Sequence, residues 1–320
     1  MGVSDARAGR SNAISTPDLS TSSHQEPPHH GTVDDLVILD TDIGWRPGSL
    51  VALVIAACVV PNLAVVTADE TRGRRARLAR HTLDALGRPE VRVVAGFDLG
   101  GEDRFLLDND HSPSVAGEDF MERIRGLDRM IAAVVELCDT ARRVQWAGLG
   151  PMSNLAAAIS RLPEIADRVV VTQLGGALDR TRGTAPVSDN FRVDPTSAGL
   201  ALRALHTPRL VLSDHTDADA LQITPHSPIL QKFEYPTPPE WADLAAAHLR
   251  AWSACEPRVS LREPLVLSAA LGLPFVSFHT ERIEIHPDAR LSRSSHGRTM
   301  QLSSTINHRD FMTWMHNTIE

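Results

Sequence analysis

The sequence predicts a single α/β domain whose mostly parallel central sheet is flanked by helices. From residue 35 onward, runs of valine, leucine and isoleucine alternate with segments of helical periodicity, as in chains built from repeated strand–helix units. The strand candidates are apolar throughout, which is typical of parallel strands buried on both faces. No internal repeat divides the chain, and its 42% hydrophobic residues can form one large core. We therefore expect one domain over residues 35–320.

The individual elements follow from the change between apolar runs and helical spacing. Strands are expected at 35–42, 63–68, 91–96, 144–148, 168–176 and 209–214. Helices are expected between them at 50–60, 74–87, 129–138, 150–162 and 195–205. An irregular segment at 216–240 precedes a helix at 241–252, short strands at 275–279, 282–286 and 299–303, and a last helix near 309–318.

Residues 1–34 differ in composition from the rest of the chain. They are rich in serine, proline, glycine and aspartate and contain almost no large apolar residue. Such a segment cannot bury enough surface to offset the entropy lost on ordering. We therefore expect a disordered N-terminal tail, and it lacks the basic and apolar regions of a signal peptide.

Composition excludes several classes of partner. The chain carries 32 basic and 40 acidic residues, a net charge of −8, and only 4% aromatic residues, which argues against binding nucleic acid. No apolar run reaches the roughly 18 residues that a membrane span needs. The three cysteines are odd in number and far apart, so we expect reduced thiols, no disulfide framework and a cytoplasmic protein.

Two carboxylates mark the end of the first strand. Asp40 and Asp42 are two residues apart in ILDTDIG, so their side chains leave the strand on the same side. In open parallel sheets, ligands bind beyond the carboxyl ends of the strands. Two like charges so close need a cation or a proton between them. The alternative is that one of the two aspartates caps the following helix.

Around these residues the sequence resembles the inosine-uridine-preferring nucleoside hydrolases. Residues 40–53 read DTDIGWRPGSLVAL, against the family's DTDIG-x-x-P-D-D-x-LAL. The resemblance continues in GLGPMSNLAAAI at 148–159, LGGALDRTRGTAPVSDNFRVDPTSA at 174–198, RLVLSDHT at 209–216 and REPLVLSAA at 262–270. It implies the family's fold, a nucleoside- or sugar-like ligand, N-glycosidic chemistry, and a homodimer or homotetramer.

The chain departs from the family where calcium is bound. The resemblance implies that Asp42 and the Leu149 carbonyl remain as metal ligands and that Asp40 and Asp42 remain near the reacting water. The family's two aspartates after the proline are Gly48 and Ser49 here. Its calcium-binding aspartate is Glu263, whose longer side chain shifts the carboxylate by about 1.5 Å. Calcium prefers six to eight oxygens with several carboxylates, so we expect no calcium and no other cofactor.

Two arginines stand at positions where the family carries other chemistry. Arg262 replaces the histidine that assists the leaving group, and Arg46 lies in the first loop. A fixed guanidinium can supply positive charge and a forked hydrogen bond to a diol, carboxylate or phosphate. We interpret the site as one in which arginine replaces the metal. The plainer alternatives are that Arg46 is solvated and that Arg262 merely pairs with Glu263 or Asp42.

Further residues are candidates for binding the ligand. Asn190 stands directly before FRVDP, where a pocket role is favoured over a simple turn, and Asn154 survives from the family pattern. Ser49 offers a hydroxyl. Trp45 either stacks on a planar ligand or covers the end of the helix. His111, in DNDHSP, either contributes to the sugar site or is solvated.

Three functions remain compatible with these residues. The first is an enzyme that acts on an N-glycoside or another furanoside without calcium, with Asp40, Asp42, Arg262 and Glu263 as catalytic residues. The second is a catalytically inactive protein that binds a sugar or nucleotide. The third is a partner subunit with a vestigial site. Because paired carboxylates have no physical purpose in a vestigial site, they favour the first.

Overall fold

A computed structural model describes Met1 and residues 35–107, 120–178, 187–216, 218–223, 227–233, 238–256 and 258–319. The expected tail therefore lies, except for Met1, outside the described residues. His111 lies outside them as well. None of the described helices is long and apolar enough to cross a membrane.

A nine-stranded sheet forms the centre of the described chain, in the order β10-β9-β11-β6-β5-β4-β1-β2-β3. The strands from β3 to β11 are parallel, and β9 pairs antiparallel with both β11 and β10. Their bounds are β1 Leu36–Thr41, β2 Leu63–Thr67, β3 Arg92–Val94, β4 Val144–Gly148, β5 Val169–Leu174, β6 Arg209–Val211, β9 Val276–Ile285, β10 Leu291–Arg293 and β11 Arg298–Ile306. A separate pair joins β7 Gln222–Ile223 to β8 Val259–Ser260.

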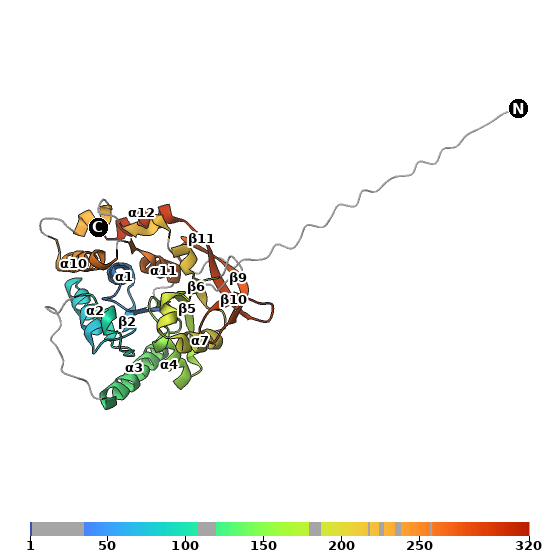
Figure 1. Cartoon of the computed structure of the whole chain (residues 1–320), viewed down its shortest axis with the longest axis horizontal. Coiled ribbons are helices and arrows are strands. Elements are labelled where there is room, and N and C mark those ends of the chain that lie inside the picture. The colour runs from blue at the N-terminus through green and yellow to red at the C-terminus, as the bar shows by residue number, and fades with distance from the viewer. Residues whose placement is uncertain are drawn as a thin grey trace.

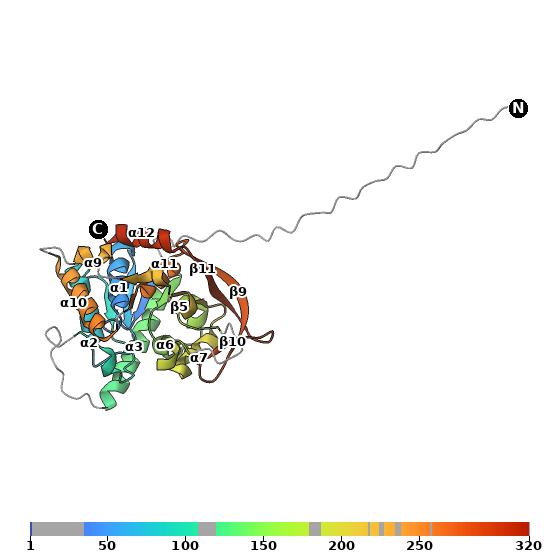
Figure 2. The ribbon, with the colours of Figure 1, turned by 45° about the horizontal axis from the view of Figure 1, so that its top comes forward.

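Helices cover both faces of the sheet, so the domain has three layers (Figure 1). One layer contains α1 Pro47–Val59, α2 Arg74–Ala85, α10 Glu240–Cys255, α11 Arg262–Ala270 and α12 His308–Thr318. The opposite layer contains α3 Phe120–Thr140, α4 Ser153–Arg161, α5 Ile165–Arg168 and α7 Pro195–Ala204. Figure 2 shows the two layers from a second direction. Shorter elements are η1 Glu102–Arg104, α6 Asp189–Val193, α8 Ser213–Thr216, η3 Asp219–Leu221 and α9 Pro228–Phe233.

The alternation of side chains along β1 explains the two cores. Val37 and Leu39 join the core beneath α1, whereas Leu36 and Ile38 join the core beneath α4. All four are at most 5% exposed. A strand buried on both faces has no polar side, which confirms the expected apolar parallel strands.

Several sequence expectations need correction. The two short strands expected at 275–279 and 282–286 are one strand, β9, because residues 276–283 pair along β11, with a single register shift between Ser303 and Thr305. Within the segment expected to be irregular, α9 and η3 form short helices. The three cysteines are free as predicted, but Cys58 is exposed and only Cys138 is buried.

The topology indicates where along the sheet edge a ligand site is expected. From the neighbours β1 and β4, the chain adds strands outward in opposite directions, β2 and β3 on one side and β5 and β6 on the other. Ligands of open α/β sheets bind at the carboxyl ends of strands where the order reverses in this way. Asp42 follows β1 and Leu149 follows β4, and the Leu149 amide donates to the Asp40 carbonyl at 2.8 Å.

Candidate functional site

Both aspartates of the first strand are buried and held by polar neighbours. The amide of Asn154 donates from Nδ2 to Asp40 Oδ1 at 2.8 Å. The hydroxyl of Ser49, in the first turn of α1, donates to Asp42 Oδ1 at 3.0 Å. Asp40 and Asp42 are only 1% and 2% exposed. The pair therefore forms the floor of the candidate site.

Burial controls how these carboxyl groups hold protons. It raises the pKa of Asp40 to about 8, although the hydrogen bond from Asn154 opposes the rise. It also raises the pKa of Asp42, against the opposing charge of Arg75 and the hydrogen bond from Ser49. A carboxylate whose pKa lies above its usual range is a better proton acceptor, as general-base catalysis requires.

The side chain of Glu263 occupies the space next to Gly48. Glu263 lies in the first turn of α11 and is 1% exposed. A Cβ atom built on Gly48 would lie 2.0 Å from Glu263 Oε2. The glutamate carboxylate therefore occupies space that a side chain at position 48 would need. Burial raises the pKa of Glu263 to about 7, opposed by the charge of Arg262.

This arrangement predicts an unusual effect of Gly48→Ala. In a helix this substitution normally stabilises by up to about 1 kcal/mol, but here the new methyl group must displace a buried carboxylate. We expect Gly48→Ala to lower the free energy of unfolding, measured with urea, by about 1–3 kcal/mol, the usual cost of overpacking. Gly126→Ala in α3 is the matched control, because a Cβ there meets no atom within 4 Å.

In a protein that already carries Glu263→Ala, the Gly48→Ala substitution should leave the free energy of unfolding unchanged. The double-mutant cycle then gives a coupling energy close to the whole single-variant loss. A Gly48→Ala variant at least as stable as the parent would show that the carboxylate does not fill this space.

Arg46 lies within an aromatic and acidic setting. Its guanidinium carbon is 5.0 Å from the ring centre of Trp45 and 5.1 Å from that of Trp252. Its Nη2 donates to Asp189 Oδ2 at 2.5 Å, so it is not simply solvated. The second predicted arginine, Arg262, has its Nε 3.9 Å from Glu263 Oε1, a distance of ionic attraction rather than a hydrogen bond.

Two asparagines hold backbone and side chains around the floor of the site. Asn190 Nδ2 donates to the Leu149 carbonyl at 2.7 Å and to the Leu174 carbonyl at 3.0 Å. Asn154 also donates from Nδ2 to the Thr67 carbonyl, and its Oδ1 accepts from the Phe97 amide. Both amide groups are thus used to join the ends of neighbouring strands.

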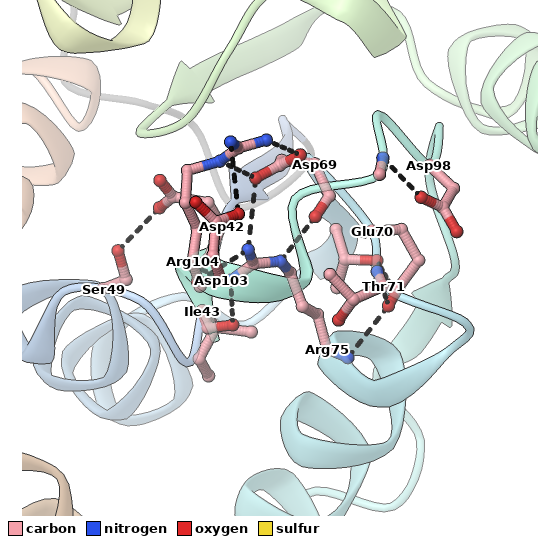
Figure 3. Close-up of polar contacts among 12 residues, drawn as sticks. Asp42, Ile43, Ser49, Asp69, Glu70, Thr71, Arg75, Asp98, Asp103 and Arg104 are labelled. Carbon is pink, nitrogen blue, oxygen red and sulfur yellow. Dashed lines mark hydrogen bonds and ion pairs between the residues drawn. The ribbon is translucent and has the colours of Figure 1, made fainter. Parts of the chain in front are cut away.

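Arg75 is not among the site residues predicted from the sequence, yet it lies at the centre of this region (Figure 3). Its side chain is fully buried. Nη1 donates to the carbonyls of Asp42 at 2.6 Å and Ile43 at 2.9 Å, and Nε donates to the Asp69 carbonyl at 2.6 Å. Nη2 donates to Asp69 Oδ2 at 3.2 Å and to the Arg104 carbonyl at 2.9 Å. One guanidinium therefore joins three loops.

Asp69 and Arg104 complete this network. Arg104 donates from Nε and Nη2 to the two carboxylate oxygens of Asp69, at 2.7 and 2.8 Å, which is the strong forked geometry. Asp69 has a φ of +49°, a conformation that aspartate tolerates better than most residues. Arg75 continues the buried face of α2, whose residues recur at helical intervals: Arg75, Leu78, Ala79, Thr82 and Leu83. This spacing alone does not reveal the burial of an arginine.

The structure brings most of the predicted site residues together. Direct contacts or hydrogen bonds connect Asp40 with Asn154, Asp42 with Ser49, and Arg46 with Trp45. The charges of Arg262, Arg46 and Asp42 act on Glu263. Among the described residues, no group of three or more histidine, cysteine, aspartate or glutamate side chains is arranged to hold a metal ion.

Comparison with known proteins identifies the family. The model of the family described as inosine-uridine preferring nucleoside hydrolase matches residues 37–313. No curated protein sequence matches significantly. A plant nucleoside hydrolase structure superimposes with a TM-score of 0.67 at 18% identity, over 92% of this chain and 99% of that one.

Two further structures have the same fold. An inosine-uridine preferring nucleoside hydrolase from Bacillus anthracis aligns with a TM-score of 0.66 and 16% identity, over 89% of this chain and 99% of that one. An inosine-guanosine nucleoside hydrolase aligns with a TM-score of 0.67 and 13% identity, over 89% and 98%. Because the family model matches residues 37–313, most of the sequence, the chain belongs to the inosine-uridine preferring nucleoside hydrolase family.

Proposed function

We propose that this protein is a glycosidase of the nucleoside hydrolase family that cleaves an N-glycoside or related furanoside without calcium. The observation that carries this proposal is the contact between Gly48 and Glu263. The resemblance implies that one of the family's two aspartates at positions 48 and 49 is its bidentate calcium ligand. Here Gly48 and Ser49 carry no carboxylate, and Glu263 fills the space beside Gly48. The site therefore keeps the family's paired aspartates, Asp40 and Asp42, but not the family's set of metal ligands.

The remaining oxygen atoms do not suit calcium. Ser49 directs its hydroxyl hydrogen to Asp42, and the Leu149 carbonyl already accepts from the Asn190 amide. Calcium prefers six to eight oxygens with several carboxylates, which this set does not provide. Arginine charges act on the carboxylates instead.

Asp42 is proposed to act as the base. It would take a proton from water as the water oxygen bonds to the anomeric carbon and the glycosidic C–N bond breaks. The electron pair of that bond leaves with the nitrogen-containing leaving group, the nucleobase of a nucleoside. Such cleavage passes through a state with positive charge on the sugar, which the negative charge of Asp42 would stabilise. Arg75 would hold the Asp42 backbone in place by donating a hydrogen bond to the Asp42 carbonyl.

The proposal is tested by measuring the release of nucleobase from substrates in the presence of EDTA. The purified protein is incubated with a panel of nucleosides, nucleotides and nitrophenyl ribofuranoside, and products are separated by chromatography. Release that EDTA leaves unchanged supports the proposal. Release that requires added calcium contradicts the calcium-independent part. A panel member that binds in calorimetry but is never cleaved would instead indicate the inactive binding protein.

A further inference from the structure

We infer that the ligand of this site is a phosphorylated furanoside, bound through its phosphate by Arg46. The inference rests on the proposed function, since it names the substrate class of the same site. It follows from which groups lie nearest to solvent, from the charge balance around Arg46, and from how firmly that side chain is held.

The arginine side chains near the site are more exposed than its two innermost carboxyl groups. The side chains of Arg262, Arg46 and Arg104 are 16%, 19% and 23% exposed. Asp42 and Glu263, by contrast, are 2% and 1% exposed. The charge of Arg46 acts on both of these carboxylates. Arg46 is therefore near both buried carboxyl groups and partly open to solvent, as is its partner Asp189 at 37% exposed.

The charge around Arg46 leaves room for an anion. Asp189 accepts from Arg46 at 2.5 Å and from Arg192 at 3.0 Å, so one carboxylate serves two guanidinium groups. Counted without Asp42 and Glu263, on which the charge of Arg46 also acts, these three residues have a net charge of +1. Within the described part of the chain, Asp189 is the hydrogen-bond acceptor of Arg46, and a guanidinium has five N–H donors. The remaining donors suit the oxygen atoms of a phosphate.

Arg46 is also held in position before any ligand binds. The rings of Trp45 and Trp252 lie at 5.0 and 5.1 Å from its guanidinium carbon, and Asp189 fixes one end of the fork. A side chain ordered in advance loses less entropy when it binds. A neutral sugar gains little from such a group, whereas a phosphate gains charge-assisted hydrogen bonds.

Calorimetric titration of the intact protein in EDTA tests this inference. The probes are D-ribose, ribose 5-phosphate and inorganic phosphate. We expect ribose 5-phosphate to bind at least about tenfold more tightly than ribose, as expected for one charged hydrogen bond. We also expect it to bind more tightly than inorganic phosphate. Arg46→Met should remove the preference for the phosphorylated sugar, and Arg46→Lys should restore part of it.

Arg161→Met is the matched control, because Arg161 is exposed on α4 in the opposite helix layer; it should keep the full preference. Equal affinity for ribose and ribose 5-phosphate, or no binding of either, would overturn the inference. So would an Arg46→Met variant that keeps the preference and melts like the parent. Inorganic phosphate that binds as tightly as ribose 5-phosphate would indicate an adventitious anion site.

These results separate the inference from the proposed function. A preference for ribose 5-phosphate with no base release from any substrate would leave the ligand class standing and remove the hydrolytic activity. Base release from neutral nucleosides by a protein that ignores ribose 5-phosphate would overturn only the inference.

Discussion

Replacing Arg75 with methionine should lower the free energy of unfolding by about 3–5 kcal/mol, the usual cost of removing one partner from a buried ion pair. The guanidinium is fully buried and its hydrogen bonds satisfy Asp69 and the carbonyls of Asp42, Ile43 and Arg104. Without it, these acceptors lose their donor and Asp69 keeps only Arg104 as its cationic partner. Chemical unfolding monitored by circular dichroism measures the loss.

Two variants control for this prediction. Arg161→Met makes the same change at an exposed position and should stay within about 0.5 kcal/mol of the parent. Arg75→Lys keeps the charge but not the fork, and its stability should fall between the parent and Arg75→Met. An Arg75→Met variant as stable as Arg161→Met would mean that this guanidinium does not hold the loops together.

Asp42→Asn should reduce base release by about 100- to 10,000-fold, the usual contribution of a positioned general base. The amide is nearly the same size and can still accept from Ser49, so the fold should survive. Because the change removes the proton acceptor and not the binding surface, kcat should fall far more than KM rises. The measurement is steady-state release of base from the best substrate of the panel.

Ser49→Ala is the companion variant, because it removes the hydroxyl that donates to Asp42 Oδ1 but leaves the carboxylate. Its loss should be much smaller than that of Asp42→Asn. If Asp42→Asn retained full activity with an unchanged melting temperature, another group would be the base, and the proposed role of Asp42 would be wrong.

The fold was predictable because most strands of its parallel part are apolar runs that carry their own signal. An apolar run such as 36–39 is buried on both faces, and only a covered parallel sheet meets that requirement. The error at β9 arose because its middle residues are polar, so composition suggested two strands. Pairing with β11 keeps the strand continuous, and pairing partners distant in sequence are invisible to local patterns.

The motif residues of the site could be predicted from the sequence, but the contacts among residues distant in the sequence could not. Asp40 and Asp42 stood out because two carboxylates at a strand end are rarely accidental. Arg75 did not, since an arginine in an amphipathic helix is usually exposed, and its burial depends on acceptors in three separate loops. The relation between Gly48 and Glu263 also required coordinates, because the two residues are brought together by the packing of α1 against α11.

The central claim, that arginines and not calcium balance the carboxylates of this site, is tested most directly by titrating calcium into EDTA-treated, dialysed protein in a calorimeter and following its melting temperature. We predict no binding heat and an unchanged melting temperature in millimolar calcium. Binding to the folded state at a hundred times Kd would add about 2.7 kcal/mol of stability. A clear calcium-dependent rise in melting temperature with one-to-one binding would contradict the claim and restore a metal to the site.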